Sequence, residues 1–376
     1  MTTWPTRSAP IERAGEALRR RERIIILTSI AQLLNSRRFL PPRALGAVAL
    51  VLAFTPAELG VASTASAEPL SPAILYDLVK FDASFNEAAY RGIERFKTET
   101  GTDYREFEVK SDVEREAVLR RFASRGEDPI IAIGFPFASS IEKVAGDFPK
   151  SRFVIVDAVV DKPNVQSVVF KEQEGGFLVG LMAAMASKTG KIGMVGGMDL
   201  PIIRRIACGY EKGAKAARSD ISVLETYAGD TPAAFTDPAR GAELARSEIG
   251  EGADVVLQAA GATGLGVLRA AADAKVLGIG SDSNQNGLFP GHVLTSLLKR
   301  TDNAVYLALR DAASGRWKPG TRLLGVAEGG IDIAIDDVDK PLVTDEMRSA
   351  LSKAKGAIAA GALIVPDWAA TRSCPP

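Results

Sequence analysis

The sequence predicts an α/β fold with two doubly wound lobes, each built on a mostly parallel sheet. Short apolar runs alternate with amphipathic segments throughout the chain after residue 67, which is typical of βαβ units. Several of these runs contain consecutive Val and Ile residues, as strands buried on both faces do. The chain has 376 residues, enough for about two domains with sizeable cores.

Residues 1–67 differ in composition from the remainder. They carry nine Arg, four Glu and no Lys or Asp, a net charge of +5, so the rest of this neutral chain carries −5. Basic residues up to Arg43 precede an 11-residue apolar run over 44–54, and the segment ends in Ala65-Ser66-Ala67. This order is typical of a secretory signal, and the apolar run is too short to span a bilayer. We therefore expect cleavage after Ala67 and a periplasmic protein.

The export route stays open at this level. Ser36-Arg37-Arg38-Phe39-Leu40 is similar to a twin-arginine signal with imperfect spacing, whereas an ordinary general-secretory leader is the preferred interpretation. A second apolar patch over 24–34 leaves room for a start further along the chain. No Cys stands at the expected cleavage site, so we do not expect a lipoprotein.

The first lobe is expected to begin with a regular alternation of strands and helices. In the first helix, apolar residues from Phe85 to Phe96 recur on one face, and Gly101 is the expected stop. The strands are expected at 73–78, 104–109, 129–134, 152–157 and 165–170, and the helices at 84–100, 113–125 and 137–148.

The second half repeats this alternation and adds an antiparallel-looking pair of strands at 323–327 and 331–335. The other strands are expected at 192–195, 223–227, 255–258, 276–280 and 292–298, and the helices at 174–186, 202–217, 238–249, 265–274, 303–313 and 344–359. We expect the chain to cross between lobes near Lys171, Gly287 and Thr321. The first lobe would then comprise 68–171 plus 288–320, and the second 172–287 plus 321–376.

Composition and motifs argue against several classes of function. A neutral chain does not favour nucleic-acid binding, and one His with two distant Cys does not favour a metal site. The chain lacks the glycine-rich nucleotide motifs and the G-x-S-x-G elbow, so we expect no cofactor and no catalytic residues. Cys208, in a helical stretch, is expected to be a buried small hydrophobe, although pairing with Cys374 in an oxidising compartment stays open.

Polar and aromatic residues follow the expected strands, where open α/β sheets bind their ligands. Each residue also has a structural interpretation: Ser84 with Glu87 fits a capping box, Asp237 before Pro238 fits an N-cap, and aspartates fit turns. The segments are 80–86 after the first strand, Asp157, Gly196-Gly197-Met198-Asp199, 234–238, Gly261-Ala262-Thr263-Gly264, 281–287 and Lys299. Together they indicate a recognition site without a nucleophile–base pair.

A set of short motifs in this order resembles the basic membrane protein family of ABC-importer substrate-binding proteins, which includes purine nucleoside receptors. The motifs are Asp82-Ala83-Ser84-Phe85-Asn86-Glu87, Gly92, Gly196-Gly197-Met198-Asp199 with Pro201, Gly209-Tyr210, Asp237-Pro238 with Gly241, Ser281-Asp282 with Gln285, Ser296 with Lys299, and Trp317-Lys318-Pro319-Gly320. The resemblance covers essentially the whole chain after residue 67. In one departure, Val79-Lys80-Phe81 stands where the family often has glycines.

The resemblance implies a type I periplasmic-binding-protein fold, with two lobes, three crossovers and a ligand cleft between them. It also implies a nucleoside ligand, preferably a purine nucleoside, a permease partner in the inner membrane, and a monomer. The implied ligand-binding residues are Phe81 and Phe235 stacking on the base, Asn86 bonding the base, Asp157 and Asp282 bonding the ribose, the Gly287 backbone beside the sugar, Lys299 on the ligand or a carboxylate, and Asp82 in the same motif. A sugar or other small molecule, and a ligand-sensing role beside a membrane receptor, remain alternatives.

Overall fold

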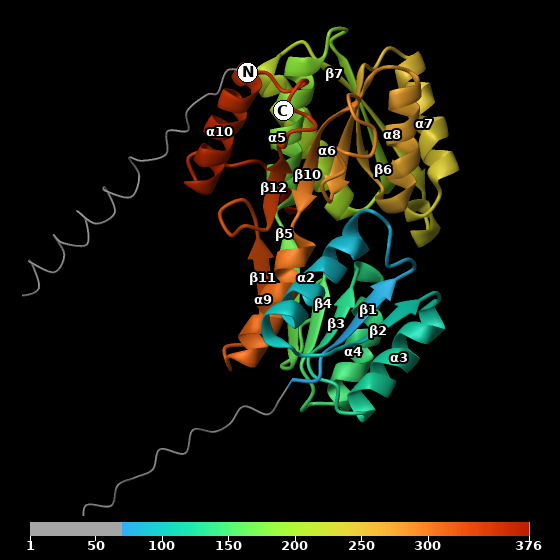
Figure 1. The fold of residues 1–376 in the computed structure, drawn as a ribbon, viewed down its shortest axis with the longest axis vertical. Coiled ribbons are helices and arrows are strands. Elements are labelled where there is room, and N and C mark those ends of the chain that lie inside the picture. The colour runs from blue at the N-terminus through green and yellow to red at the C-terminus, as the bar shows by residue number, and fades with distance from the viewer. Residues whose placement is uncertain (1–69, 376) are drawn as a thin grey trace, which may run out of the picture. The chain divides into compact units, whose positions relative to one another are not determined.

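The computed structural model describes residues 70–375 of the chain (Figure 1). The expected secretory leader and its cleavage site after Ala67 lie outside these residues. Within them, two six-stranded sheets with helices packed against them form two lobes, which confirms the predicted α/β class. In this part of the chain, no helix combines the length and apolar character needed to cross a membrane.

The first lobe contains an all-parallel sheet in the order β11-β5-β4-β3-β1-β2. Its central strands β3 and β4 consist of consecutive apolar residues that are completely buried. The strands are β1 (Ala73–Asp77), β2 (Arg105–Val109), β3 (Ile130–Ile133), β4 (Phe153–Val156), β5 (Val165–Phe170) and β11 (Gly320–Leu324), and the helices are α2 (Phe85–Thr100), α3 (Asp112–Ser124), α4 (Ala138–Asp147) and α9 (Thr301–Ala313).

The second lobe contains a sheet in the order β12-β10-β9-β8-β6-β7, in which only β12 is antiparallel to its neighbour. Its strands are β6 (Lys191–Met198), β7 (Ser222–Gly229), β8 (Val255–Ala259), β9 (Leu277–Asp282), β10 (Val293–Lys299) and β12 (Ile331–Ala334). The helices are α5 (Glu172–Ala186), α6 (Pro201–Ala217), α7 (Pro238–Gly250), α8 (Gly264–Asp273), α10 (Asp345–Ala359) and α11 (Trp368–Thr371), with a short 3₁₀ turn η2 (Pro232–Phe235) before α7.

Two of the three expected crossovers lie elsewhere in the structure. The chain leaves the first sheet at Lys171, as expected, but it returns at Arg300 instead of Gly287 and crosses again over 325–330. Residues 288–299 therefore belong with the second lobe, and 321–324 with the first. The polar stretch 283–292 has the composition of a linker, but it joins two neighbouring strands of one sheet, β9 and β10.

The expected antiparallel pairing of 323–327 with 331–335 is wrong. Strand β11 runs parallel to β5 in the first sheet, whereas β12 runs antiparallel to β10 in the second. The glycines between them gave the segment the appearance of a hairpin, but this stretch is the third crossover. Each strand completes the edge of a different sheet.

Helices α5 and α6 lie very close together because glycines occupy their contact surface. A Cβ at Gly180 of α5 would overlap the backbone of Tyr210 on α6, and a Cβ at Gly213 would overlap the backbone of Phe177. The close approach buries α5 almost completely. It also fixes the start of α5, where Glu172 follows the first crossover, against α6.

A disulfide joins Cys208 of α6 to Cys374, with an S–S distance of 2.08 Å. The pairing that the sequence left open is therefore present, and Cys208 is buried, as its place in a helix suggested. The bond holds the segment with α11 against α6. Asp367, which caps α11, reaches Arg205 of α6, with 2.7 Å between Oδ1 and Nε.

Candidate functional site

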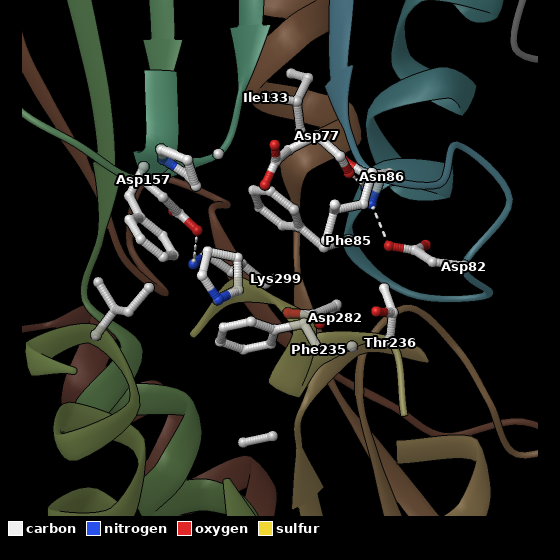
Figure 2. A pocket seen from close by; sticks show the side chains of 18 of the residues that line it. Asp77, Asp82, Phe85, Asn86, Ile133, Asp157, Phe235, Thr236, Asp282 and Lys299 are labelled. Carbon is white, nitrogen blue, oxygen red and sulfur yellow. Dashed lines mark hydrogen bonds and ion pairs between the residues drawn. The ribbon is translucent and has the colours of Figure 1, made fainter. Parts of the chain in front are cut away.

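A cavity lies between the two lobes, at the carboxyl ends of strands from both sheets (Figure 2). The cavity and the open solvent at its mouth together comprise about 840 Å³. The lining residues are Asp77, Leu78, Val79, Asp82, Phe85, Asn86, Ile133, Gly134, Phe135, Pro136 and Asp157 from the first lobe, and Ile202, Ile203, Ile206, Pro232, Phe235, Thr236, Ala259, Gly261, Ser281, Asp282 and Lys299 from the second.

Six of the eight residues expected at a ligand site line this cavity, and two do not. The six are Asp82, Asn86, Asp157, Phe235, Asp282 and Lys299. Phe81 and Gly287 lie outside its lining. Gly287 is in the loop between β9 and β10, and a Cβ added there would meet no atom within 4 Å, so nothing approaches it closely.

Phe81 lies on the surface of the first lobe, where its side chain is 60% exposed. Its ring packs edge-on against Tyr90 with 5.3 Å between centroids, and the Lys80 ammonium lies 4.6 Å from its centroid. Phe85 lines the cavity instead, from the first turn of α2. The helical spacing of the sequence placed Phe85 with the buried face of α2. A residue in the first turn of a helix can also face the end of the preceding strand. The position of Phe85 as the first residue of α2 therefore favours a place in the cavity wall.

Three aromatic residues line the cavity: Phe85 and Phe135 from the first lobe and Phe235 from the second. Among them, Phe85 and Phe235 stand on opposite walls (Figure 2). Phe235 ends the 3₁₀ turn η2 and lies directly against β6. Gly197 makes this possible, since a Cβ at that position would overlap the Phe235 ring. The space between the two rings has one flat apolar surface from each lobe.

Asp82 stabilises the start of α2. Its carboxylate accepts hydrogen bonds from the backbone N–H groups of Ser84 at 2.8 Å, Asn86 at 3.0 Å and Glu87 at 3.2 Å. Glu87 accepts from the N–H of Ala83 and not from that of Ser84, and the Ser84 side chain caps nothing, so the capping box considered for these two residues does not form. Burial raises the pKa of Asp82 to about 6 despite these bonds.

Asn86 has a fixed orientation, because its Nδ2 donates to the carbonyl oxygens of Asp77 at 2.8 Å and Val79 at 2.9 Å. Its Oδ1 is buried and has no hydrogen-bond partner in the protein, and the same is true of Asp157 Oδ1. Buried polar atoms are rarely left unpaired. Two residues of the cavity wall therefore carry acceptors that a ligand with N–H or O–H groups can satisfy.

Asp157 and Asp282 occupy equivalent positions in the two lobes, each at the carboxyl end of an inner strand. Both have a left-handed backbone, with φ of 71° and 66°, a conformation that Asp adopts more readily than most residues. Both interpretations considered for these aspartates therefore apply, since each forms a turn and each also lines the cavity. Burial raises the pKa of Asp282, although Lys299 opposes the change.

Lys299 lies at the end of β10, next to the second crossover, and is surrounded by carboxylates. Its Nζ is 2.7 Å from Asp157 Oδ2 and 3.2 Å from Glu172 Oε1, and all three side chains are buried. Burial alone would lower the pKa of Lys299, but Asp157, Glu172 and Asp282 outweigh it and raise that pKa. Burial likewise raises the pKa of Glu172.

The structure adds three charged residues that sequence reasoning missed. Glu172 pairs with Lys299 but does not itself line the cavity. Asp77, at the end of β1, lines the wall and pairs with Arg115, with 2.6 Å between Oδ1 and Nη2. Asp77 is the last residue of β1, so its position at a strand end could have been recognised. Nothing in the pattern marks Glu172 or Arg115. Across the described residues, no group of His, Cys, Asp and Glu has the arrangement of a metal site.

Known proteins match the chain over nearly all of the part that the structure describes. A family model described as Bmp, ABC transporter substrate-binding protein PnrA-like, matches residues 72–367. The nucleoside-binding protein BmpA of an ABC transporter in Lactococcus lactis subsp. cremoris is 34% identical, over 76% of this chain and 86% of that protein. An uncharacterised lipoprotein of Pyrococcus furiosus is 33% identical, over 76% of this chain and 75% of that protein.

A solved structure agrees with these sequences. An ABC transporter solute-binding protein from Aeropyrum pernix K1 superimposes with a TM-score of 0.72 at 28% identity, over 79% of this chain and 94% of that one. The fold is therefore the expected type I periplasmic-binding-protein fold, with its cavity between the lobes. Since the family model covers both lobes and the residues of the cavity wall, the chain belongs to the PnrA-like family of ABC transporter substrate-binding proteins.

Proposed function

We propose that this protein acts in the periplasm as a monomer, binds a nucleoside between its lobes, preferably a purine nucleoside, and delivers it to an ABC permease in the inner membrane. The observation that carries the proposal is the pair of rings, Phe85 and Phe235, on opposite walls of one cavity. Stacking on an aromatic ring contributes about 1–3 kcal/mol per base and tolerates different bases. In this proposal Phe85 takes the role that the family resemblance implied for Phe81.

The polar groups of the cavity support the sugar part of the proposal. Asp157 and Asp282 present carboxylates from the two lobes, and carboxylates accept strong hydrogen bonds from hydroxyl groups. The unpaired Oδ1 atoms of Asn86 and Asp157 call for donors, which a ribose and a base edge supply. The disulfide supports export, since such bonds persist in oxidising compartments. The name of the Lactococcus relative supports the ligand class.

Calorimetric titration of the purified protein with adenosine, guanosine, inosine, uridine, the free bases and a set of sugars tests the proposal. Heat from the nucleosides, and none from free ribose or other sugars, is the expected result. If a sugar binds and no nucleoside does, the same cavity serves the alternative ligand class, and the nucleoside proposal is wrong.

Replacing Phe235 or Phe85 with Ala should weaken nucleoside binding about 5- to 150-fold, because each ring contributes about 1–3 kcal/mol of stacking. Titration of both variants measures the loss. Phe81→Ala is the matched control: its ring is exposed and outside the cavity, so its affinity should equal that of the wild type. A loss in Phe81→Ala together with normal binding by the other two would reverse our assignment of the stacking residues.

Nucleoside 5′-monophosphates should bind at least tenfold more weakly than their nucleosides. Four aspartates, Asp77, Asp82, Asp157 and Asp282, line the cavity, and its Lys299 is already paired with Asp157 and Glu172. Enclosing a phosphate among these carboxylates costs free energy by like-charge repulsion and desolvation. Competition of inosine monophosphate with bound inosine measures the ratio. Equal affinities would mean that the 5′ position lies in solvent, contrary to an enclosed ligand.

A further inference from the structure

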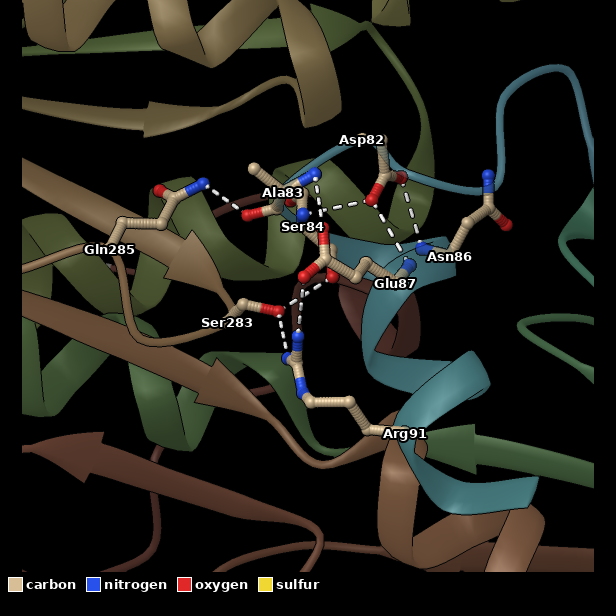
Figure 3. Close-up of polar contacts among 8 residues, drawn as sticks. All are labelled: Asp82, Ala83, Ser84, Asn86, Glu87, Arg91, Ser283 and Gln285. Carbon is tan, nitrogen blue, oxygen red and sulfur yellow. Dashed lines mark hydrogen bonds and ion pairs between the residues drawn. The ribbon is translucent and has the colours of Figure 1, made fainter. Parts of the chain in front are cut away.

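Polar contacts join the two lobes directly, beside the cavity, between the start of α2 and the residues after β9 (Figure 3). We call Ala83, Ser84, Arg91, Ser283 and Gln285 the interlobe clasp. Ser283 Oγ donates to the Ser84 carbonyl at 2.6 Å, and Gln285 Nε2 donates to the Ala83 carbonyl at 2.9 Å. Arg91 Nη2 donates to Ser283 Oγ at 2.6 Å. None of these five residues lines the cavity.

Ser84 connects the clasp to the cavity wall of the opposite lobe. Ser84 Oγ, from the first lobe, donates to Asp282 Oδ2, in the second lobe, at 2.6 Å. Ser84 is completely buried, so this bond is shielded from water. The orientation of the Asp282 carboxylate in the cavity therefore depends on a residue of the opposite lobe.

The clasp is noncovalent and spans two bodies that can move apart. Helix α2 packs on the first sheet through Ala89, Ile93 and Phe96, whereas residues 281–285 continue β9 of the second sheet. In the described part of the chain, the backbone passes between the lobes only at Lys171, Arg300 and 325–330. A rotation of the lobes about these crossovers, the usual motion of such proteins, separates the two sides of the clasp.

The second-lobe side of the clasp is held rigidly before the lobes meet. Gln285 Oε1 accepts from Gln258 Nε2 at 2.8 Å and from the N–H of Ser281 at 3.1 Å, which directs its Nε2 toward the first lobe. Ser283 and Gln285 are 5% and 1% exposed. Because these donors are fixed in place, little conformational entropy is lost when they bond to the carbonyls of the first lobe.

We propose that the interlobe clasp stabilises the closed arrangement of the lobes and thereby sets ligand affinity from outside the cavity. Ser84 is the positioning residue that acts through Asp282, while Arg91, Ser283 and Gln285 hold the lobes together. The apparent Kd of a ligand rises as the fraction of closed protein falls. Losing the clasp therefore weakens binding and speeds release without removing a ligand contact. The identity of the ligand, but not the clasp itself, rests on the proposed function.

The test uses a double variant that combines Arg91→Met with Ser283→Ala and compares it with the wild type. The matched control is Arg95→Met: Arg95 lies one turn further along α2, is similarly exposed, and contacts Glu99 and Tyr306, both in the first lobe. Inosine affinity by calorimetry, its dissociation rate by stopped flow, and the radius of gyration without ligand by X-ray scattering are measured for each protein. Circular dichroism checks that all of them fold.

We expect the double variant to bind inosine about tenfold more weakly, since it loses hydrogen bonds that contribute about 1 kcal/mol each. Its dissociation should be faster and its ligand-free radius larger, while Arg95→Met matches the wild type. The single variant Arg91→Lys keeps a charged donor and Ser283, so it should lose less inosine affinity than the double variant. An unchanged dissociation rate or an unchanged radius in the double variant would overturn the clasp. If the wild type binds no nucleoside, the proposed function fails, and the ligand-free radius alone decides the clasp.

Discussion

Lys299→Met is expected to lower the free energy of unfolding by about 3–5 kcal/mol at neutral pH, the usual cost of breaking a buried ion pair from one side. The substitution leaves Asp157 and Glu172 buried beside each other without the ammonium that lies within 3.2 Å of both. Nucleoside binding should also be lost, because the carboxylates of the cavity would no longer be held in place. Urea unfolding and calorimetric titration measure the two effects.

The destabilisation of Lys299→Met should depend on pH in a known direction. Burial raises the pKa of Glu172, and Lys299 opposes this change, so without the cation the folded state retains a proton that the unfolded chain has released. The variant is therefore least destabilised below pH 4 and loses stability as the pH rises toward neutrality. Adding Glu172→Gln should recover part of the loss by removing one of the carboxylates.

Lys355→Met is the control for this comparison. Lys355 pairs with Asp332 at the surface, where both side chains are at least one third exposed, and such pairs contribute about 0–1 kcal/mol. If Lys299→Met unfolds as easily as this control, or if its loss of stability is the same at pH 5 and pH 7.5, the buried carboxylates do not need their cation. The role we give Lys299 would then be wrong.

The fold could be predicted from the sequence wherever a local pattern decides the structure. Short runs of β-branched and aromatic residues such as Phe153–Val156 favour strands buried on both faces, and this run lies in the centre of the first sheet. Sheet membership is different, because it depends on which partner a strand finds. The residues of β11 and β12 do not indicate their partners, so two short apolar runs on either side of glycines predict an antiparallel pair, whereas the segment between them crosses from one lobe to the other.

In the candidate site, too, local patterns could be predicted from the sequence, whereas contacts between distant residues could not. Residues directly after strands, such as Asp157 and Asp282, could be placed at the cavity because strand ends converge at one edge of each sheet. The same reasoning placed Phe81 wrongly, because the direction in which a loop side chain points depends on the loop backbone. Leu78 and Ala83, on either side of Phe81, both have left-handed backbones. Ala83 and Gln285 could not be paired from the sequence either, because about 200 residues separate them and only the closed lobes bring them together.

A second large effect is expected in the core of the second lobe, at Glu248. This side chain of α7 is 1% exposed and lies beside β6, where Gly193 leaves room for its carboxyl group. Its Oε1 accepts from Thr226 Oγ1 at 2.8 Å, but its Oε2 has no hydrogen-bond partner in the protein. Burial raises the pKa of Glu248 to about 7, from an ordinary value of 4.5.

Glu248 should therefore make the protein less stable as the pH rises. Below pH 4.5 the carboxyl is protonated in both states and has no effect. Between pH 4.5 and 7 the unfolded chain releases the proton while the folded protein retains it, so unfolding becomes easier, and the penalty is complete above pH 7. This gap in pKa corresponds to about 3 kcal/mol.

Glu248→Gln should remove that penalty, because the amide keeps an acceptor for Thr226 and carries no charge. We expect the variant to exceed the wild type by about 2–3 kcal/mol in unfolding free energy at pH 8, and to match it near pH 4.5. Urea unfolding across this range measures the difference. Glu243→Gln, at an exposed position of the same helix, should change stability by less than about 0.5 kcal/mol at either pH. A constant difference between Glu248→Gln and the wild type at all pH values would contradict the prediction, since a packing effect does not depend on protons.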